Sequence, residues 1–182
     1  FDDLEPLKAL VGEARIVSLG ECTHGTREVF QMKHRLVEYL ASQRGFTIFS
    51  IEANMPEAYR LNDYVLNGKG DPKSLIAGMY FWTWNTEEVL AMVEWMRQFN
   101  QSGKGRIEFT GFDMQTPDVA MDVVVGFLEK ADSERVGGVE DTYRTLRKGA
   151  FRAGTGSSFG VATETLPLEA AKGKHVRYSG WI

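Results

Sequence analysis

The chain has 182 residues, of which 43% are hydrophobic and 25% are charged, and its formal net charge is −4. This composition is typical of a globular domain, and the length suits one domain with part of another. The acidic balance argues against a nucleic-acid partner, and no apolar run approaches the roughly 18 residues that a membrane helix needs. With a single cysteine, Cys22, no disulfide forms within the chain.

The first residue is Phe1 rather than methionine, so we expect the natural start of the protein to lie upstream. The compartment therefore stays open between cytoplasmic and exported.

Three short segments rich in apolar, β-branched or aromatic residues are predicted as buried strands: residues 14–20, 46–54 and 106–113. A helix is expected after each strand, because apolar residues then recur every three or four positions. This β-α-β-α-β-α order predicts an α/β fold with a three-stranded parallel sheet and right-handed crossovers.

Turn and capping residues indicate where the helices begin and end. The first helix is expected to end at Gly45, and Pro56 suits the first turn of the second. Asn85 and Glu88 have the spacing of a capping pair for a further helix. The last helix is predicted to open at Thr116 and to turn four apolar residues inward: Val119, Val123, Val124 and Phe127.

An aromatic segment, "GMYFWTWNTEEV", precedes the helix that starts near Asn85. Its two tryptophans, Trp82 and Trp84, either cap the core or line a pocket. Farther along, residues 133–156 are predicted to be a linker, and residues 157–182 the beginning of a second, β-rich module.

Acid and base groups follow each predicted strand. Glu21 and His24 lie in a turn bounded by glycines after the first strand, Glu52 near the end of the second, and Asp113 at the end of the third. Because the carboxyl ends of parallel strands share one edge, we expect these groups to form a site there. The alternative is that such carboxylates only cap the following helices, which Asp113 is well placed to do.

Four stretches resemble the erythromycin esterase-like family: "LGECTHGTREVFQMKHRLVEYL", "FSIEANMPEA", "FWTWNTEEVLAMVEWMRQFN" and "GFDMQ". The resemblance covers residues 1–132 and implies that His24 acts as general base on a water molecule, with Glu21 and Glu52 as its partners. Lys33 falls where members of that family present a basic side chain. The further substrate-binding candidates are Asp113, Trp82 and Trp84.

The family domain is longer, and its second half supplies an arginine and a histidine to the site. The resemblance thus implies that residues 1–132 are part of an esterase-like domain whose activity needs that second half. The segment 157–182 is similar to the opening of a β-sandwich accessory module of the carbohydrate-binding kind.

The leading hypothesis is a hydrolase that cleaves a carboxylic ester or macrolide-type lactone with water activated by His24 and with neither metal nor cofactor. A serine nucleophile is not expected, since the Gly-x-Ser-x-Gly motif is absent. Two alternatives remain: a metal-dependent hydrolase that uses Glu21, His24 and Glu52, and a non-catalytic protein that binds a small ligand. The expected partner is a small ester or lactone, and the oligomeric state is open.

Overall fold

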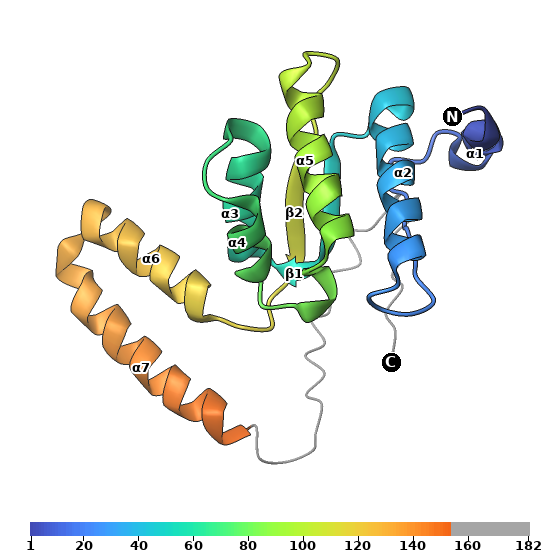
Figure 1. Ribbon diagram of the computed structural model, residues 1–182. Coiled ribbons are helices and arrows are strands. Elements are labelled where there is room, and N and C mark those ends of the chain that lie inside the picture. Colours follow the sequence, from blue (N-terminus) through green and yellow to red (C-terminus); the bar gives the residue numbers. More distant parts are fainter. Residues whose placement is uncertain (154–182) are drawn as a thin grey trace. The chain divides into compact units, whose positions relative to one another are not determined.

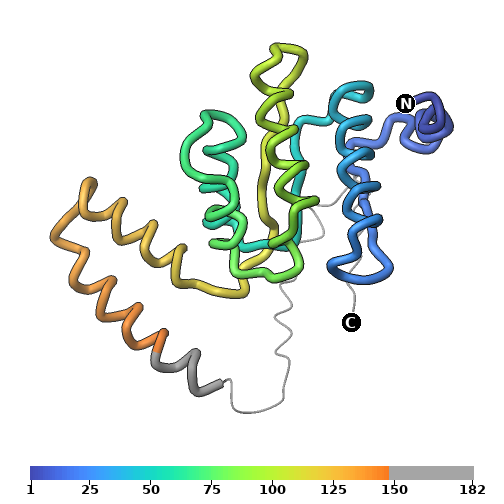
Figure 2. The backbone as a smooth tube through the Cα atoms, in the orientation of Figure 1, coloured from blue at the N-terminus to red at the C-terminus, as the bar shows by residue number. Residues whose placement is uncertain are grey.

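The computed structural model describes the backbone of residues 1–153 and the side chains through residue 147. Its first compact unit spans Phe1–Val136. Figure 1 shows helices packed around a small sheet in this unit, and Figure 2 follows the same path as a continuous tube. The elements in chain order are η1 (Asp2–Leu4), α1 (Glu5–Val11), α2 (Arg27–Arg44), β1 (Ile48–Asn54), α3 (Met55–Asn67), α4 (Pro72–Ala77), η2 (Trp82–Trp84), α5 (Glu87–Gln101), β2 (Glu108–Asp113), α6 (Asp118–Ala131), η3 (Ser133–Arg135) and α7 (Val136–Ala153).

The sheet has two parallel strands, β1 and β2. Ile51 pairs with Gly111, and the next pair is Asn54 with Asp113, so β1 has one extra residue between these pairs. Such a bulge changes the direction of the side chains beside it. Gly111 permits it, because a Cβ there would lie 2.1 Å from the carbonyl oxygen of Ala53.

The structure does not confirm the predicted three-stranded unit, because residues 14–20 form no strand. Ile16 is 83% exposed, whereas Val17 and Leu19 pack against buried residues that include Tyr39 and Leu40 of α2. The apolar pattern in this segment thus reflects contacts with a helix rather than a place in the sheet. The α/β class and the parallel pairing of the other two strands hold.

The helix boundaries follow local chemistry at most of the predicted positions. Helix α2 ends at Gly45, whose φ of 72° is left-handed, and Pro56 lies in the first turn of α3. The predicted cap of α5 is wrong by one residue: the side chain of Thr86 accepts the Val89 amide at 3.2 Å. Glu88 instead accepts a hydrogen bond from the Arg27 side chain.

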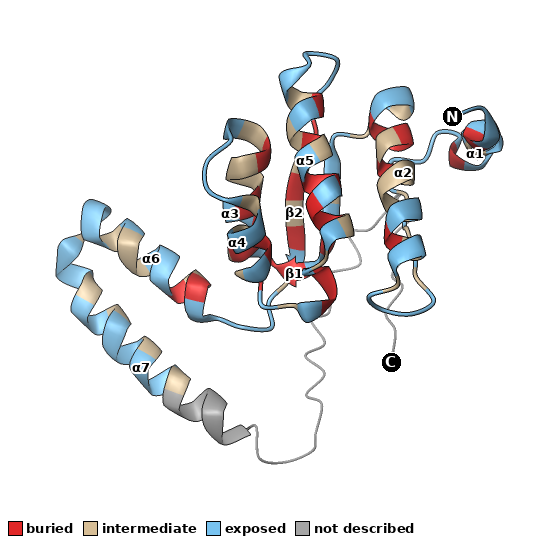
Figure 3. Ribbon diagram, in the orientation of Figure 1, coloured by how far each residue is buried: buried red, intermediate tan, exposed pale blue. Residues whose placement is uncertain are grey.

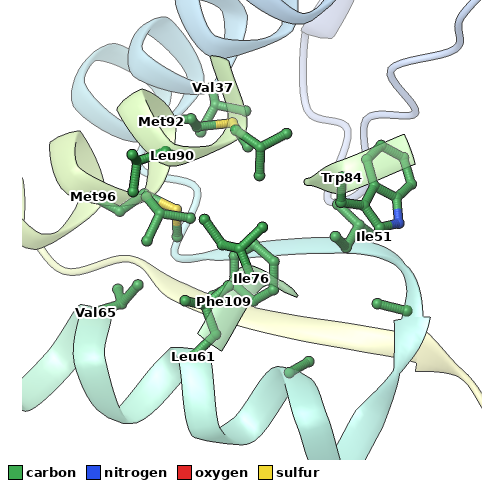
Figure 4. Close-up of a cluster of buried hydrophobic side chains, with 14 of the residues drawn as sticks. Val37, Ile51, Leu61, Val65, Ile76, Trp84, Leu90, Met92, Met96 and Phe109 are labelled. Carbon is green, nitrogen blue, oxygen red and sulfur yellow. The ribbon is translucent and has the colours of Figure 1, made fainter. Parts of the chain in front are cut away.

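The core lies between α2, α3, α4, α5 and the strands (Figure 4). Val93 and Met96 of α5, Leu61 of α3 and Phe109 of β2 are all fully buried. Burying one such side chain stabilises the fold by about 1.5–3 kcal/mol. This packing holds the carboxyl ends of β1 and β2 in place.

Helix α6 differs from the prediction in its burial. Val119 is buried, but Val123, Val124 and Phe127 are 55%, 41% and 67% exposed. Figure 3 shows most of α6 beyond its first turn as exposed or intermediate. The apolar spacing predicted the helix correctly, but in the described residues only its first turn lies against the core.

Residues 133–153, most of the predicted linker, form η3 and α7. Helix α7 carries Gly137 and Gly138 near its start and belongs mostly to a second unit. The role of this segment as a linker remains a prediction. The predicted β-rich module, 157–182, lies outside the described residues.

Candidate functional site

Glu21, His24 and Lys33 form a linked group at the start of α2. His24 Nδ1 is hydrogen-bonded to Glu21 Oε1, and Lys33 Nζ donates to Glu21 Oε2 at 2.5 Å. The left-handed φ of Gly25, 71°, lets the chain turn directly after His24 into the helix. Glu21 thus lies between two cationic or proton-donating groups.

The exposures of these three side chains differ in a way that suits a reactive group. The side chains of Glu21 and Lys33 are 11% and 14% exposed, whereas that of His24 is 55% exposed. Burial opposes ionisation of Glu21, but the hydrogen bonds from Lys33 and His24 outweigh burial and lower the pKa of this carboxyl. Glu21 is therefore a carboxylate at neutral pH, and the histidine that it orients is open to solvent.

Aromatic rings hold Lys33 in place. Its ammonium lies 5.6 Å from the ring centre of Phe30 and 5.8 Å from that of Trp84. Both distances are within the range of cation–π attraction. Trp84 itself is buried, packs on Phe30 and donates its indole N–H to the backbone oxygen of Glu52 at 2.8 Å.

The two tryptophans of the aromatic segment have different surroundings. Trp84 belongs to the core, whereas Trp82 is 73% exposed and meets the His24 ring edge-on, with ring centres 6.5 Å apart. A Cβ at Gly25 would lie 3.2 Å from the Trp82 ring. Trp82 therefore presents an open aromatic surface beside the histidine.

Glu52 and Asp113 lie at the carboxyl ends of the two strands. The side chain of Gln115 donates to Asp113 Oδ2 at 2.7 Å and lies 3.5 Å from Glu52 Oε1. The backbone amide of Met114 also donates to Asp113, at 2.7 Å. The structure thus brings these two carboxylates to one edge of the sheet.

The predicted site residues fall into two groups. Glu21, His24, Lys33 and Trp82 are one group, and Glu52 with Asp113 is the other. Trp84 lies between them, since its ring is under Lys33 and its N–H contacts the Glu52 backbone. Among the described residues, the hydrogen bonds and ion pairs of these groups do not join the Glu52 carboxylate to His24 or Glu21.

Two buried polar residues that sequence reasoning missed, Asn54 and Glu57, follow Glu52 closely in the chain. Asn54 is fully buried and Glu57 is 2% exposed; both bind the Thr116 side chain. The signal was available, because an asparagine at the end of an apolar strand with a glutamate three residues later requires buried partners. A search for acid and base groups does not detect this pattern, because the amide of an asparagine neither gives nor takes a proton near neutral pH.

In the part of the chain whose side chains are described, no cluster of three histidine, cysteine or carboxylate side chains has the arrangement of a metal site. Cys22 is exposed and unbonded to another cysteine. No described helix is long and apolar enough to span a membrane.

Comparison with known proteins gives matches to longer chains. A protein named "Erythromycin esterase type II" from Escherichia coli is 28% identical over 155 residues, which are 81% of this chain and 36% of that protein. A protein named "Putative hydrolase YbfO" from Bacillus subtilis is 32% identical over 114 residues, which are 63% of this chain and 25% of that protein.

Two solved structures share the fold. A crystal structure described as a succinoglycan biosynthesis protein matches with a TM-score of 0.69 and 37% identity, over 80% of this chain and 37% of that one. A Bacillus cereus protein matches with a TM-score of 0.67 and 37% identity, over 80% of this chain and 35% of that one. The chain thus spans between 25% and 37% of the length of these relatives.

The family model for erythromycin esterase matches residues 41–175, which is most of the chain. The match includes both strands, Glu52, the aromatic segment and Asp113. Together with the shared fold, it shows that the chain belongs to the erythromycin esterase family.

Proposed function

We propose that this chain contributes the histidine side of a hydrolase active site that cleaves a carboxylic ester or a macrolide-type lactone. The observation that carries the proposal is the Glu21–His24 hydrogen bond on a partly buried, Lys33-paired carboxylate, with the imidazole half exposed. The names of the two relatives, an erythromycin esterase and a hydrolase, support the reaction class.

In this mechanism Glu21 accepts the Nδ1–H of His24, which leaves Nε2 to take a proton from water. The water oxygen forms a bond to the ester carbonyl carbon, and the ester C–O bond then breaks. The proton held on Nε2 passes to the departing alkoxide. Lys33 keeps Glu21 ionised, so the imidazolium formed during the reaction is stabilised by a neighbouring negative charge.

The remaining residues have supporting roles in the proposal. Glu52 and Asp113 bind or orient water and the polar groups of the substrate. Trp82 offers its exposed face to an apolar part of the substrate, as aromatic rings do in many binding sites. Trp84, which is buried, acts through Lys33 and the Glu52 backbone.

The relatives are longer than this chain, so we further propose that full activity needs groups from their remaining part. A tetrahedral intermediate needs oxyanion donors, and loss of one such donor costs about 10²–10³-fold in rate. Residues 1–182 by themselves should therefore hydrolyse a simple ester or a macrolide much more slowly than the protein as its gene encodes it.

The test is ester and macrolide hydrolysis by the protein as its gene encodes it, with His24→Ala beside the matched control His34→Ala. His34 lies on α2 and pairs with Glu38, at 3.1 Å. We expect His24→Ala to lower kcat by about 10²–10⁴-fold, Glu52→Gln to lower it less, and His34→Ala to leave it nearly unchanged.

Undiminished turnover by a folded His24→Ala variant would refute the histidine mechanism. Activity that a chelator abolishes and added zinc or manganese restores would favour the metal-dependent alternative. Ligand-induced thermal stabilisation without product over hours would favour a binding protein.

A further inference from the structure

Both polar atoms of the Asn54 side chain, Oδ1 and Nδ2, are hydrogen-bonded at the carboxyl end of β1. Its Oδ1 accepts the backbone amides of Gln115, at 2.7 Å, and Thr116, at 3.3 Å. Its Nδ2 donates to Thr116 Oγ1 at 2.5 Å and to Glu57 Oε1 at 3.2 Å. Because Asn54 is fully buried, these bonds lack competition from water.

The consequence is that the turn after β2 is fixed to the end of β1. Residues 115 and 116 follow β2 closely, and their amides have Asn54 as acceptor. The exposed side chain of Gln115 then extends back over the strand ends, where it meets Asp113 and approaches Glu52.

The backbone of Glu52 is already fixed by other means. Trp84 binds its carbonyl oxygen, and the bulge opposite Gly111 sets the direction of the strand. Among the described residues, the hydrogen-bond partner of the Glu52 carboxylate is Gln115 alone. Gln115 is therefore the described side chain that is placed to orient that carboxylate.

We propose that Asn54 and Gln115 are positioning residues. Asn54 fixes the 115–116 turn, and the side-chain amide of Gln115 then orients the Glu52 and Asp113 carboxylates for their role in the reaction. This inference rests on the proposed function, because that function places the Glu52 and Asp113 carboxylates in the active site. Neither residue touches the reacting atoms in this scheme.

If Asn54 had a purely structural role, its replacement would destabilise the protein without a specific effect on Gln115 or on kcat. Asn100 provides the matched control, because it makes the same kind of clamp on the other end of β2. Its side chain accepts the Ile107 amide at 2.7 Å and donates to the oxygens of Ile107 and Val65, at 2.9 and 3.1 Å. Loss of either clamp should destabilise the protein.

The experiment compares Asn54→Ala, Gln115→Leu, their double variant and Asn100→Ala in the protein as its gene encodes it. Gln115 is exposed, so Gln115→Leu should fold even if Asn54→Ala is too unstable to study. Amide hydrogen exchange at residues 115 and 116 reports the clamp without any need for turnover. Steady-state hydrolysis then gives kcat and KM separately.

We expect Asn54→Ala to lower the hydrogen-exchange protection of the Gln115 and Thr116 amides about ten-fold, because each amide loses its acceptor. Gln115→Leu should keep the Thr116 protection. Both variants should lower kcat, by up to about 10²-fold, with little change in KM. The double variant should be no slower than Gln115→Leu alone, since Asn54 acts through Gln115.

Retained protection in Asn54→Ala, additive losses in the double variant, or an equal loss of kcat in Asn100→Ala would each overturn the inference. A wild-type protein that hydrolyses no ester or lactone would instead refute the proposed function and the positioning role together. In that case the exchange data would still show whether Asn54 holds the turn, so the two failures are distinguishable.

Discussion

At the scale of single residues, the central feature is that the Glu21 carboxylate binds two side chains, His24 and Lys33. One carboxylate oxygen orients His24 and the other pairs with Lys33, and the side chain is nearly buried. Removing one partner of a largely desolvated ion pair is costly, because the remaining charge is then unpaired. Stability and histidine orientation therefore depend on the same carboxylate.

Replacing Glu21 with Gln tests this dependence. We expect the free energy of unfolding to fall by about 1–3 kcal/mol at neutral pH, since the hydrogen bonds to a charged acceptor are weakened. The pKa of Glu21 is lower in the folded protein than its ordinary value, so its stabilising contribution is complete above the unfolded pKa. It is lost as pH falls through the folded pKa.

Urea unfolding at a series of pH values provides the measurement. The difference in free energy of unfolding between wild type and Glu21→Gln should be constant near neutral pH. It should vanish in acid, below the ordinary glutamate pKa of about 4.3. Glu5→Gln is the control, because the Glu5–Lys8 pair is 3.5 Å long and mostly exposed. A gap that persists unchanged into strong acid would show that the charge of Glu21 is not what stabilises the fold.

At the scale of elements, the close approach of β1 and β2 decides where the carboxylates of the candidate site, Glu52 and Asp113, lie. The bulge in β1 lies next to Glu52, and Gly111 of β2 leaves the space that it needs. The Ala53 oxygen that a side chain at Gly111 would meet is a backbone atom, so it cannot move without shifting the strand. Strand geometry and site geometry are thus coupled at one glycine.

Gly111→Ala should accordingly destabilise the protein by about 2–4 kcal/mol, because the new methyl group displaces backbone. Gly126→Ala is the matched control, since Gly126 lies inside α6 and a Cβ added there would meet no atom within 4 Å. That change should be neutral or stabilising by up to about 1 kcal/mol. Equal thermal stability of the two variants would contradict the close approach at Gly111.

At the scale of the whole molecule, several large apolar side chains of the first unit remain exposed. Phe112 and Met114, on either side of Asp113 in the chain, are 70% and 89% exposed, and Val123 and Phe127 of α6 are 55% and 67% exposed. Apolar surface of this extent favours association with other surfaces.

We therefore expect residues 1–182 to self-associate when concentrated, and Phe127→Lys to reduce that association. Light scattering across a concentration series would measure it. Leu10→Lys is the control, since Leu10 is 80% exposed but lies on α1, away from this group. A wild-type chain that stays monomeric throughout, or equal effects of both substitutions, would contradict the role assigned to α6.

Much of the local structure could be predicted from the sequence, because its signals act over a few residues. Gly45 ended a helix by adopting a left-handed conformation, and Pro56 fitted a first helical turn. Hydrophobic periodicity located α2, α5 and α6, Pro56 located the start of α3, and apolar β-branched runs located both strands. The pairing of Glu21 with His24 was also suggested locally, since the two residues lie three positions apart in one turn.

The remaining features were decided by contacts between distant segments. Residues 14–20 have the pattern of a buried strand, but only the tertiary fold determined that they pack on a helix instead. Trp82 and Trp84 are two residues apart, and only three-dimensional packing buried one and exposed the other. The clamp between Asn54 and Thr116 spans 62 residues, so the chain had to fold before those polar groups could find one another. Local propensity thus determined which elements form, whereas burial and hydrogen bonding across the fold decided how those elements place the candidate site.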